Sequence, residues 1–168
     1  VFSAAAATGT IDADLSAITT ANLTSVVGGT GSSDVVRLGA GVTVNSTTND
    51  LSKVSAFETL LLNAGATIAL SADTAGITKF DFSAATDQVL TLSTGYTGAT
   101  TVTLTGDAGA NADTITNGAN VALEVIANGA DIDATTTITG GTGTDTLTLK
   151  ADGGTTATLT LVTGVEAI

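Results

Sequence analysis

The stretch Gly140–Leu149, GGTGTDTLTL, joins a glycine-rich turn to an alternating Thr-Leu segment. It fills every fixed position of the pattern Gly-Gly-x-Gly-x-Asp-x-(apolar)-x, which is typical of calcium-binding turns in repetitive β-proteins. Glycine allows positive φ, so the backbone can turn its carbonyl oxygens toward a hard cation, while Asp145 supplies a formal charge. The alternation after Asp145 indicates a strand with one buried face. The stretch therefore predicts a calcium-binding turn that leads directly into a β-strand.

Two further segments are imperfect copies of this turn. Gly28–Leu38, GGTGSSDVVRL, has one extra residue before Asp34. Gly106–Thr116, GDAGANADTIT, has Asp107 in place of the second glycine and Asp113 before its Thr-Ile-Thr. We expect Asp34, Asp107 and Asp113 to be calcium ligands as well, with Asp145 in the best-preserved site.

A second phrase repeats downstream of the two better turns. VSAFETL, Val54–Leu60, is matched by VTGVEAI, Val162–Ile168. The shared order is glycine turn, aspartate, alternating strand, loop, and then an apolar-Glu-small-apolar phrase. This order predicts an internal repeat whose second copy is incomplete at Ile168. The matching glutamates, Glu58 and Glu166, are either ligands from a neighbouring turn or exposed strand residues.

Composition excludes several classes of function. The net charge of -12 argues against a nucleic-acid partner and leaves a cation partner open. The chain has no Cys and no His, which removes disulfides, zinc clusters and Ser-His catalysis. Paired carboxylates could hydrolyse glycosides, but sugar-binding sites usually offer aromatic platforms, and this chain has one Tyr and no Trp. We therefore expect a protein that is not an enzyme.

The same composition predicts an all-β fold with a thin core. Half of the chain is Thr, Ala or Gly, with 36, 28 and 20 residues. Threonine and valine favour strands, and the Gly, Asn and Asp clusters between them favour turns. The pattern predicts strands at 35–38, 42–44, 59–62, 67–70, 77–82, 89–92, 100–104, 114–116, 121–126, 135–138, 146–149, 156–161 and 165–168. Residues 12–26 show weak helical spacing, although a strand or loop fits them equally well.

The chain shows no targeting or membrane segment. Its first residues lack an initiating Met and a basic region, which indicates an interior or processed end. No window approaches the roughly 20 apolar residues of a membrane-spanning helix, so membrane insertion is not expected. We expect a lead-in segment over residues 1–27 and a repeat region over residues 28–168 that belongs to a longer chain.

The GGxGxD turns, the Thr-rich alternating strands and the phrases VSAFETL and GITKFDFSA resemble the β-strand repeats of bacterial surface-layer proteins and of large secreted adhesins with RTX-type calcium turns. The resemblance implies a right-handed parallel β-helix or β-roll, that is, a β-solenoid. It also implies an extracellular structural protein of the bacterial cell surface that self-assembles, with cell-surface polysaccharide as a possible partner. Carbonyl oxygens would join the carboxylates as calcium ligands, which adds Gly28, Thr30, Gly140 and Thr142 to the candidate site. Calcium turns come in tandem in that family, whereas here they are separated, so each ion would join individual turns.

Two other functions stay open. The first is a calcium-dependent adhesin or carbohydrate-binding module. The second is ice binding, which uses flat rows of Thr-x-Thr. Such triplets begin at Thr101, Thr114, Thr137, Thr146 and Thr158, with spacings of 13, 23, 9 and 12 residues. Because these spacings are uneven, the hydroxyl groups are expected to be out of register, and threonine is explained as a strand residue.

Overall fold

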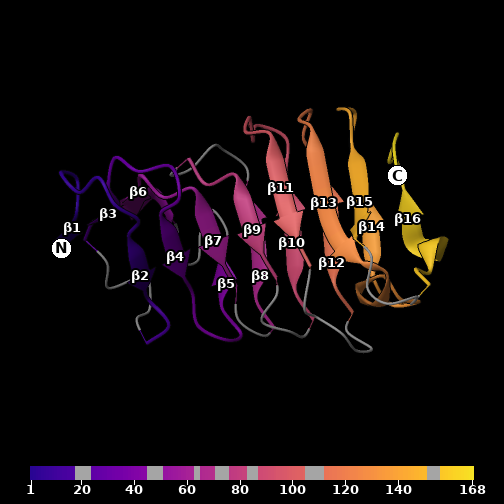
Figure 1. Ribbon diagram of the computed structural model, residues 1–168, viewed down its shortest axis with the longest axis horizontal. Helices are drawn as coiled ribbons and strands as arrows, with labels where there is room; N and C mark the ends of the chain where they lie inside the picture. Colours follow the sequence, from indigo (N-terminus) through magenta and orange to yellow (C-terminus); the bar gives the residue numbers. More distant parts are fainter. Residues whose placement is uncertain are drawn as a thin grey trace.

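The computed structural model of the chain is an all-β solenoid in which parallel strands stack from one end to the other (Figure 1). It describes residues 1–17, 24–44, 51–62, 65–70, 76–82, 87–104, 112–150 and 156–168. The two termini lie at opposite ends of the stack (Figure 1). The predicted β-solenoid is confirmed. We call one turn of the solenoid a coil.

The described part of the solenoid contains three parallel sheets; the chain returns to sheet A as far as β6 and then alternates between sheets B and C. Sheet A contains β1 (Phe2–Ser3), β3 (Val26–Val27) and β6 (Val54–Ser55). Sheet B contains β2 (Asp12–Asp14), β4 (Val35–Arg37), β7 (Thr59–Leu61), β9 (Lys79–Asp81), β11 (Thr100–Thr103), β13 (Leu123–Asn128) and β15 (Thr146–Lys150). Sheet C contains β5 (Thr43–Val44), β8 (Thr67–Leu70), β10 (Val89–Leu92), β12 (Thr114–Asn117), β14 (Thr137–Thr139) and β16 (Val162–Thr163).

Coils differ in length, yet their strands keep one register. Val89 pairs with Thr67, 22 residues before it, and with Thr114, 25 residues after it. The extra residues lie in the connections, because inserting them into a strand would turn its buried side chains toward solvent. Inward and outward rows therefore run straight along the stack.

The core is a narrow apolar column between the sheets. One inward row of sheet B and one of sheet C face each other across it, and large aromatic side chains enter from only a few positions, as the composition predicts. The sheet B row is Ala13, Val36, Leu60, Phe80, Val102, Val125 and Leu147; the sheet C row is Val44, Ile68, Leu90, Ile115 and Ile138.

Most predicted strands are confirmed within a few residues, and the exceptions are informative. Residues 156–161 do not form the predicted strand: Leu159–Leu161 is the 3-10 helix η4, followed by β16. In the last segment, predicted as a strand, the structure has a single bridge, between Thr146 and Ala167. The strands β1, β2, β3, β6 and β16 were not predicted, because two or three residues are too short to show alternation.

The first residues of the chain join the stack. β1 pairs with β3, and β2 pairs with β4, both in parallel. Of the segment with weak helical spacing, residues 12–14 and 26–27 are strands, and residues 18–23 lie outside the described part. Two more short 3-10 helices, η2 (Leu51–Lys53) and η3 (Gly129–Asp131), lie in connections. No helix in the described ranges has the length and hydrophobicity to cross a bilayer.

Prediction for the core: Leu90→Ala should lower the free energy of unfolding by about 2–5 kcal/mol, because Leu90 is fully buried on sheet C and its neighbours in the column cannot fill the cavity. The matched control is Thr91→Ala, the next residue on the outer face, which should change it by under about 0.5 kcal/mol. Urea unfolding followed by circular dichroism measures both variants. Equal losses would contradict the assignment of the inward row.

Candidate functional site

The candidate ligands Asp34 and Asp145 occupy the same row of sheet B, the position just before the strand. In register order this row includes Ile11, Asp34 and Glu58 at one end of the stack, and Leu123, Asp145 and Glu166 at the other. The backbone carbonyl of a residue in this row accepts a hydrogen bond from a backbone N–H of the next coil, as Asp34 O does from Thr59 N at 3.0 Å. Its N–H also needs an acceptor, because an unsatisfied buried N–H is costly.

Asp34 satisfies two such groups with its side chain. Its Oδ1 accepts from Ile11 N, on the preceding coil, at 2.7 Å, and its Oδ2 accepts from Gly29 N, in its own turn, at 2.7 Å. The backbone N–H of Asp34 is in turn donated to Glu58 Oε2 at 2.8 Å. Since Asp34 is 0% exposed, these N–H groups replace the solvation that burial removes from the carboxylate.

Asp145 repeats this arrangement in the second copy. Its Oδ1 accepts from Leu123 N at 2.9 Å, and its Oδ2 accepts from Gly141 N at 2.6 Å. Its N–H is donated to Glu166 Oε2 at 2.6 Å, and the residue is 0% exposed. One additional donor, Asn117 Nδ2, lies 3.0 Å from Oδ1. We call each Asp–Glu pair with its N–H partners a coil latch.

The glycines of the turn allow the coils of a latch to approach closely. A Cβ atom on Gly28 would lie 1.8 Å from Ala56 O, and one on Gly140 would lie 1.8 Å from Gly164 O. Ala56 and Gly164 are themselves equivalent, with positive φ of 57° and 64°. The repeated phrases therefore correspond to one structural unit, in which the first glycine of the turn faces the bend before the glutamate.

Sheet C has a related row, made by the candidate ligand Asp113 and by Gln88, which was not predicted. Gln88 Oε1 accepts from Ala66 N at 3.2 Å, and Asp113 Oδ1 accepts from Gln88 N at 2.7 Å. Both side chains are buried, and each accepts a hydrogen bond from a backbone N–H of the preceding coil. The position of Gln88 in the sequence could have indicated this role, because Gln88 directly precedes an alternating strand, as Asp34 does.

The other candidate ligands near the turns make hydrogen bonds of their own. Thr30 donates its hydroxyl to Ala7 O at 3.1 Å, and Thr142 donates to Asn120 Oδ1 at 2.9 Å, both at exposed positions. The N–H groups of Gly28 and Gly140 are donated to Ser55 O and Thr163 O. Asp107 lies outside the described residues.

The environment of Asp34 and Asp145 does not fit calcium. Calcium is bound by six to eight oxygen atoms, whereas here each carboxylate oxygen accepts at least one N–H donor. Donor hydrogens at these positions would repel a cation. In the described ranges, no three or more Asp and Glu residues are grouped so that they could hold a metal ion. Calcium at the glycine turns stays a prediction from the repeat pattern.

Other acidic residues also serve local structure. Asp131 lies in η3, is buried, and accepts from Asn128 N at 2.8 Å. Hydrogen bonds from Thr135 hold the pKa of Asp133 below its usual range. On the outer face of sheet B, Arg37 donates two hydrogen bonds to Asp12, at 2.7 and 2.6 Å, which lower the pKa of that carboxyl group.

Comparisons of the chain with protein-family models, with curated proteins and with solved structures gave no match. The resemblance to surface-layer repeats therefore rests on the sequence phrases themselves.

Prediction for the latch: Glu58→Ala should lower the free energy of unfolding by about 1–3 kcal/mol, because it leaves the buried Asp34 N–H without its acceptor. Glu58→Gln keeps an oxygen at that position and should retain most of the stability. Chemical denaturation of both variants measures the difference. If Gln and Ala cost the same, the hydrogen bond to Asp34 does not stabilise the fold.

Prediction for calcium: Asp145→Asn should destabilise the chain equally in calcium and in excess chelator, because the amide places a donor against N–H groups already present around the side chain. Thermal unfolding in the two buffers, with the wild-type chain alongside, measures this. A loss seen only in calcium would show that the carboxylate binds the ion.

Proposed function

We propose that this chain is a structural β-solenoid of a bacterial cell-surface protein, and that it works by self-association. The observation that carries the proposal is the coil latch. The acidic residues that the sequence marks as functional use their oxygen atoms to fasten one coil to the next, at two places in the chain. Carboxylates whose oxygen atoms are held by backbone N–H groups stiffen the solenoid, which suits a structural role better than a catalytic one.

The ends of the sheets support assembly. In the described part, β2 and β15 end sheet B, and β5 and β16 end sheet C. Edge strands of a parallel stack present backbone groups that further strands can pair with. A solenoid built from quasi-equivalent coils can therefore extend by adding β-structure at its ends.

The proposed self-association does not depend on calcium at the coil latches. The latches supply within the chain the linkage that a cation between turns would supply. The chain nevertheless carries a net charge of -12, so divalent cations could act between solenoids by reducing repulsion.

The carbohydrate-binding alternative receives less support. Tyr96 is buried and donates its hydroxyl to Ile77 O at 2.7 Å, and Phe57, Phe80 and Phe82 are buried in the core. A hollow of about 310 Å³ crosses the starts of β11, β13 and β15, and its lining is Thr, Ala and Leu with Glu124 as the charged group. The stacking surface that a sugar ring prefers is not among these residues.

Ice binding gains one specific observation. The expectation that the Thr-x-Thr triplets are out of register is wrong for two of them, because Thr114 pairs with Thr137 and Thr116 with Thr139. Variable loops absorb the uneven spacing. Ice binding is therefore the second candidate, and thermal hysteresis of the purified chain tests it.

Prediction for the function: the purified chain should form ordered sheets or fibres in negative-stain electron microscopy, more readily at high salt, because salt screens the repulsion between acidic chains. Sedimentation of the same samples gives the assembled fraction. A chain that stays monomeric at every concentration and salt level would contradict the proposal.

A further inference from the structure

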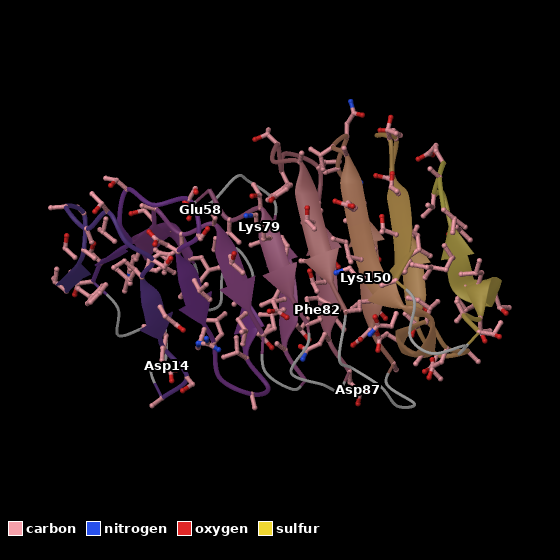
Figure 2. All side chains as sticks on the ribbon, viewed as in Figure 1. Asp14, Glu58, Lys79, Phe82, Asp87 and Lys150 are labelled. Atoms are coloured by element: carbon pink, nitrogen blue, oxygen red, sulfur yellow. The ribbon has the colours of Figure 1, made fainter. Side chains whose placement is uncertain are left out.

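Charged side chains are unevenly distributed over the strands. The described strands of sheet C contain no charged residue, although the chain has a net charge of -12. Lys79 and Lys150 are labelled on sheet B strands in Figure 2. The charged residues in the strands of sheet B are Asp12, Asp14, Arg37, Lys79, Asp81, Glu124 and Lys150.

The outward side chains of sheet C form two straight rows of small residues. All of them are half-buried or exposed, and none is larger than valine. The first row is Thr43, Thr67, Val89, Thr114 and Thr137; the second is Ala69, Thr91, Thr116, Thr139 and Thr163. We call this surface the threonine face.

We propose that the threonine face is the surface through which two copies of this chain associate, sheet C against sheet C. The proposal deepens the proposed function, since it rests on self-association and names a lateral surface for it, in addition to the ends of the sheets. Face-to-face β-sheets pack about 10 Å apart, with the side chains of the two faces interdigitating. Short β-branched side chains suit this packing, because their methyl groups are buried at low entropic cost and their hydroxyls can hydrogen bond across the interface.

The distribution of charge favours association through sheet C over association through sheet B. Bringing two chains of charge -12 together is unfavourable wherever carboxylates meet. Two copies that meet through sheet B would have to remove water from four acidic and three basic groups on each face, which is costly unless every charge finds a partner. Of the described acids that precede the strands of the threonine face, Asp113 before β12 is buried, whereas Asp87 before β10 and Asp133 before β14 are exposed or half-buried. Asp87 and Asp133 border the face, where water can still solvate them.

The interruptions in the rows favour protein over ice. Val89 and Ala69 replace hydroxyl groups in the middle and at the end of the two rows. An apolar side chain is compatible with packing between sheets, because burying its surface is favourable at about 25 cal/mol per Å². At the same position, the array of hydroxyl groups that would match an ice surface is broken.

The test uses a charge placed on each face. Thr116→Glu lies at the centre of the threonine face, and its matched control, Thr103→Glu, lies on the outer face of sheet B in β11. Sedimentation equilibrium of the wild-type chain should show dimers or larger species. Thr116→Glu should raise the dissociation constant by about tenfold or more, since like charges would face each other across the interface, and Thr103→Glu should leave it within about twofold.

A second measurement keeps the proposal testable if the glutamate disturbs folding. The chain has no cysteine, so single cysteines report contacts directly. Under mild oxidation Thr116→Cys should form disulfide-linked dimers, and Thr103→Cys should not. If wild-type association survives Thr116→Glu but is lost in Thr103→Glu, sheet B is the interface and the inference fails while self-association stands. A monomeric wild-type chain overturns the proposed function itself, and thermal hysteresis lost in Thr116→Glu would then assign the face to ice.

Discussion

At several coils of this solenoid a side chain of the next coil accepts the buried N–H group of the residue that starts or precedes the strand, and the coil latches follow from that interaction. At these coils the carbonyl of that residue accepts from the backbone of the next coil, as Asp34 O accepts from Thr59 N, whereas its N–H is donated to a side chain. Side chains from the following coil supply the acceptor: Asp34 accepts from Ile11 N, Glu58 from Asp34 N, and Asp113 from Gln88 N. The stack is thus joined by side-chain acceptors as well as by its β-ladders.

This requirement gives the glycine-aspartate turn a different meaning. Its aspartate points into the stack and accepts N–H groups from two segments, and its first glycine gives room for a carbonyl of the next coil. A motif selected for backbone carbonyls and a carboxylate can therefore stabilise a solenoid with or without a metal. The charge that remains outside lies on sheet B and in the connections, which leaves sheet C as a neutral surface.

Much of the fold was predictable, because alternation of Thr with Leu, Val or Ile sets the inward rows over most strands longer than three residues. The repeat of Asp34 and Asp145, each followed by a glutamate, also marked the true structural unit. The partners of those carboxylates were not predictable. One oxygen of each carboxylate accepts from its own turn, but the other accepts from the preceding coil, 23 residues away for Ile11 with Asp34, and the lengths of the loops decide which residues meet. Register across uneven loops likewise needed three-dimensional coordinates, as the pairing of Thr114 with Thr137 shows.

Amide hydrogen exchange at the latch residues tests this account most directly. If side-chain acceptors hold the coils together, the N–H groups of Ile11, Asp34, Leu123 and Asp145 should exchange as slowly as those inside neighbouring strands, in calcium and in chelator alike. Exchange at the rate of exposed loops, or protection that appears only when calcium is added, would contradict it.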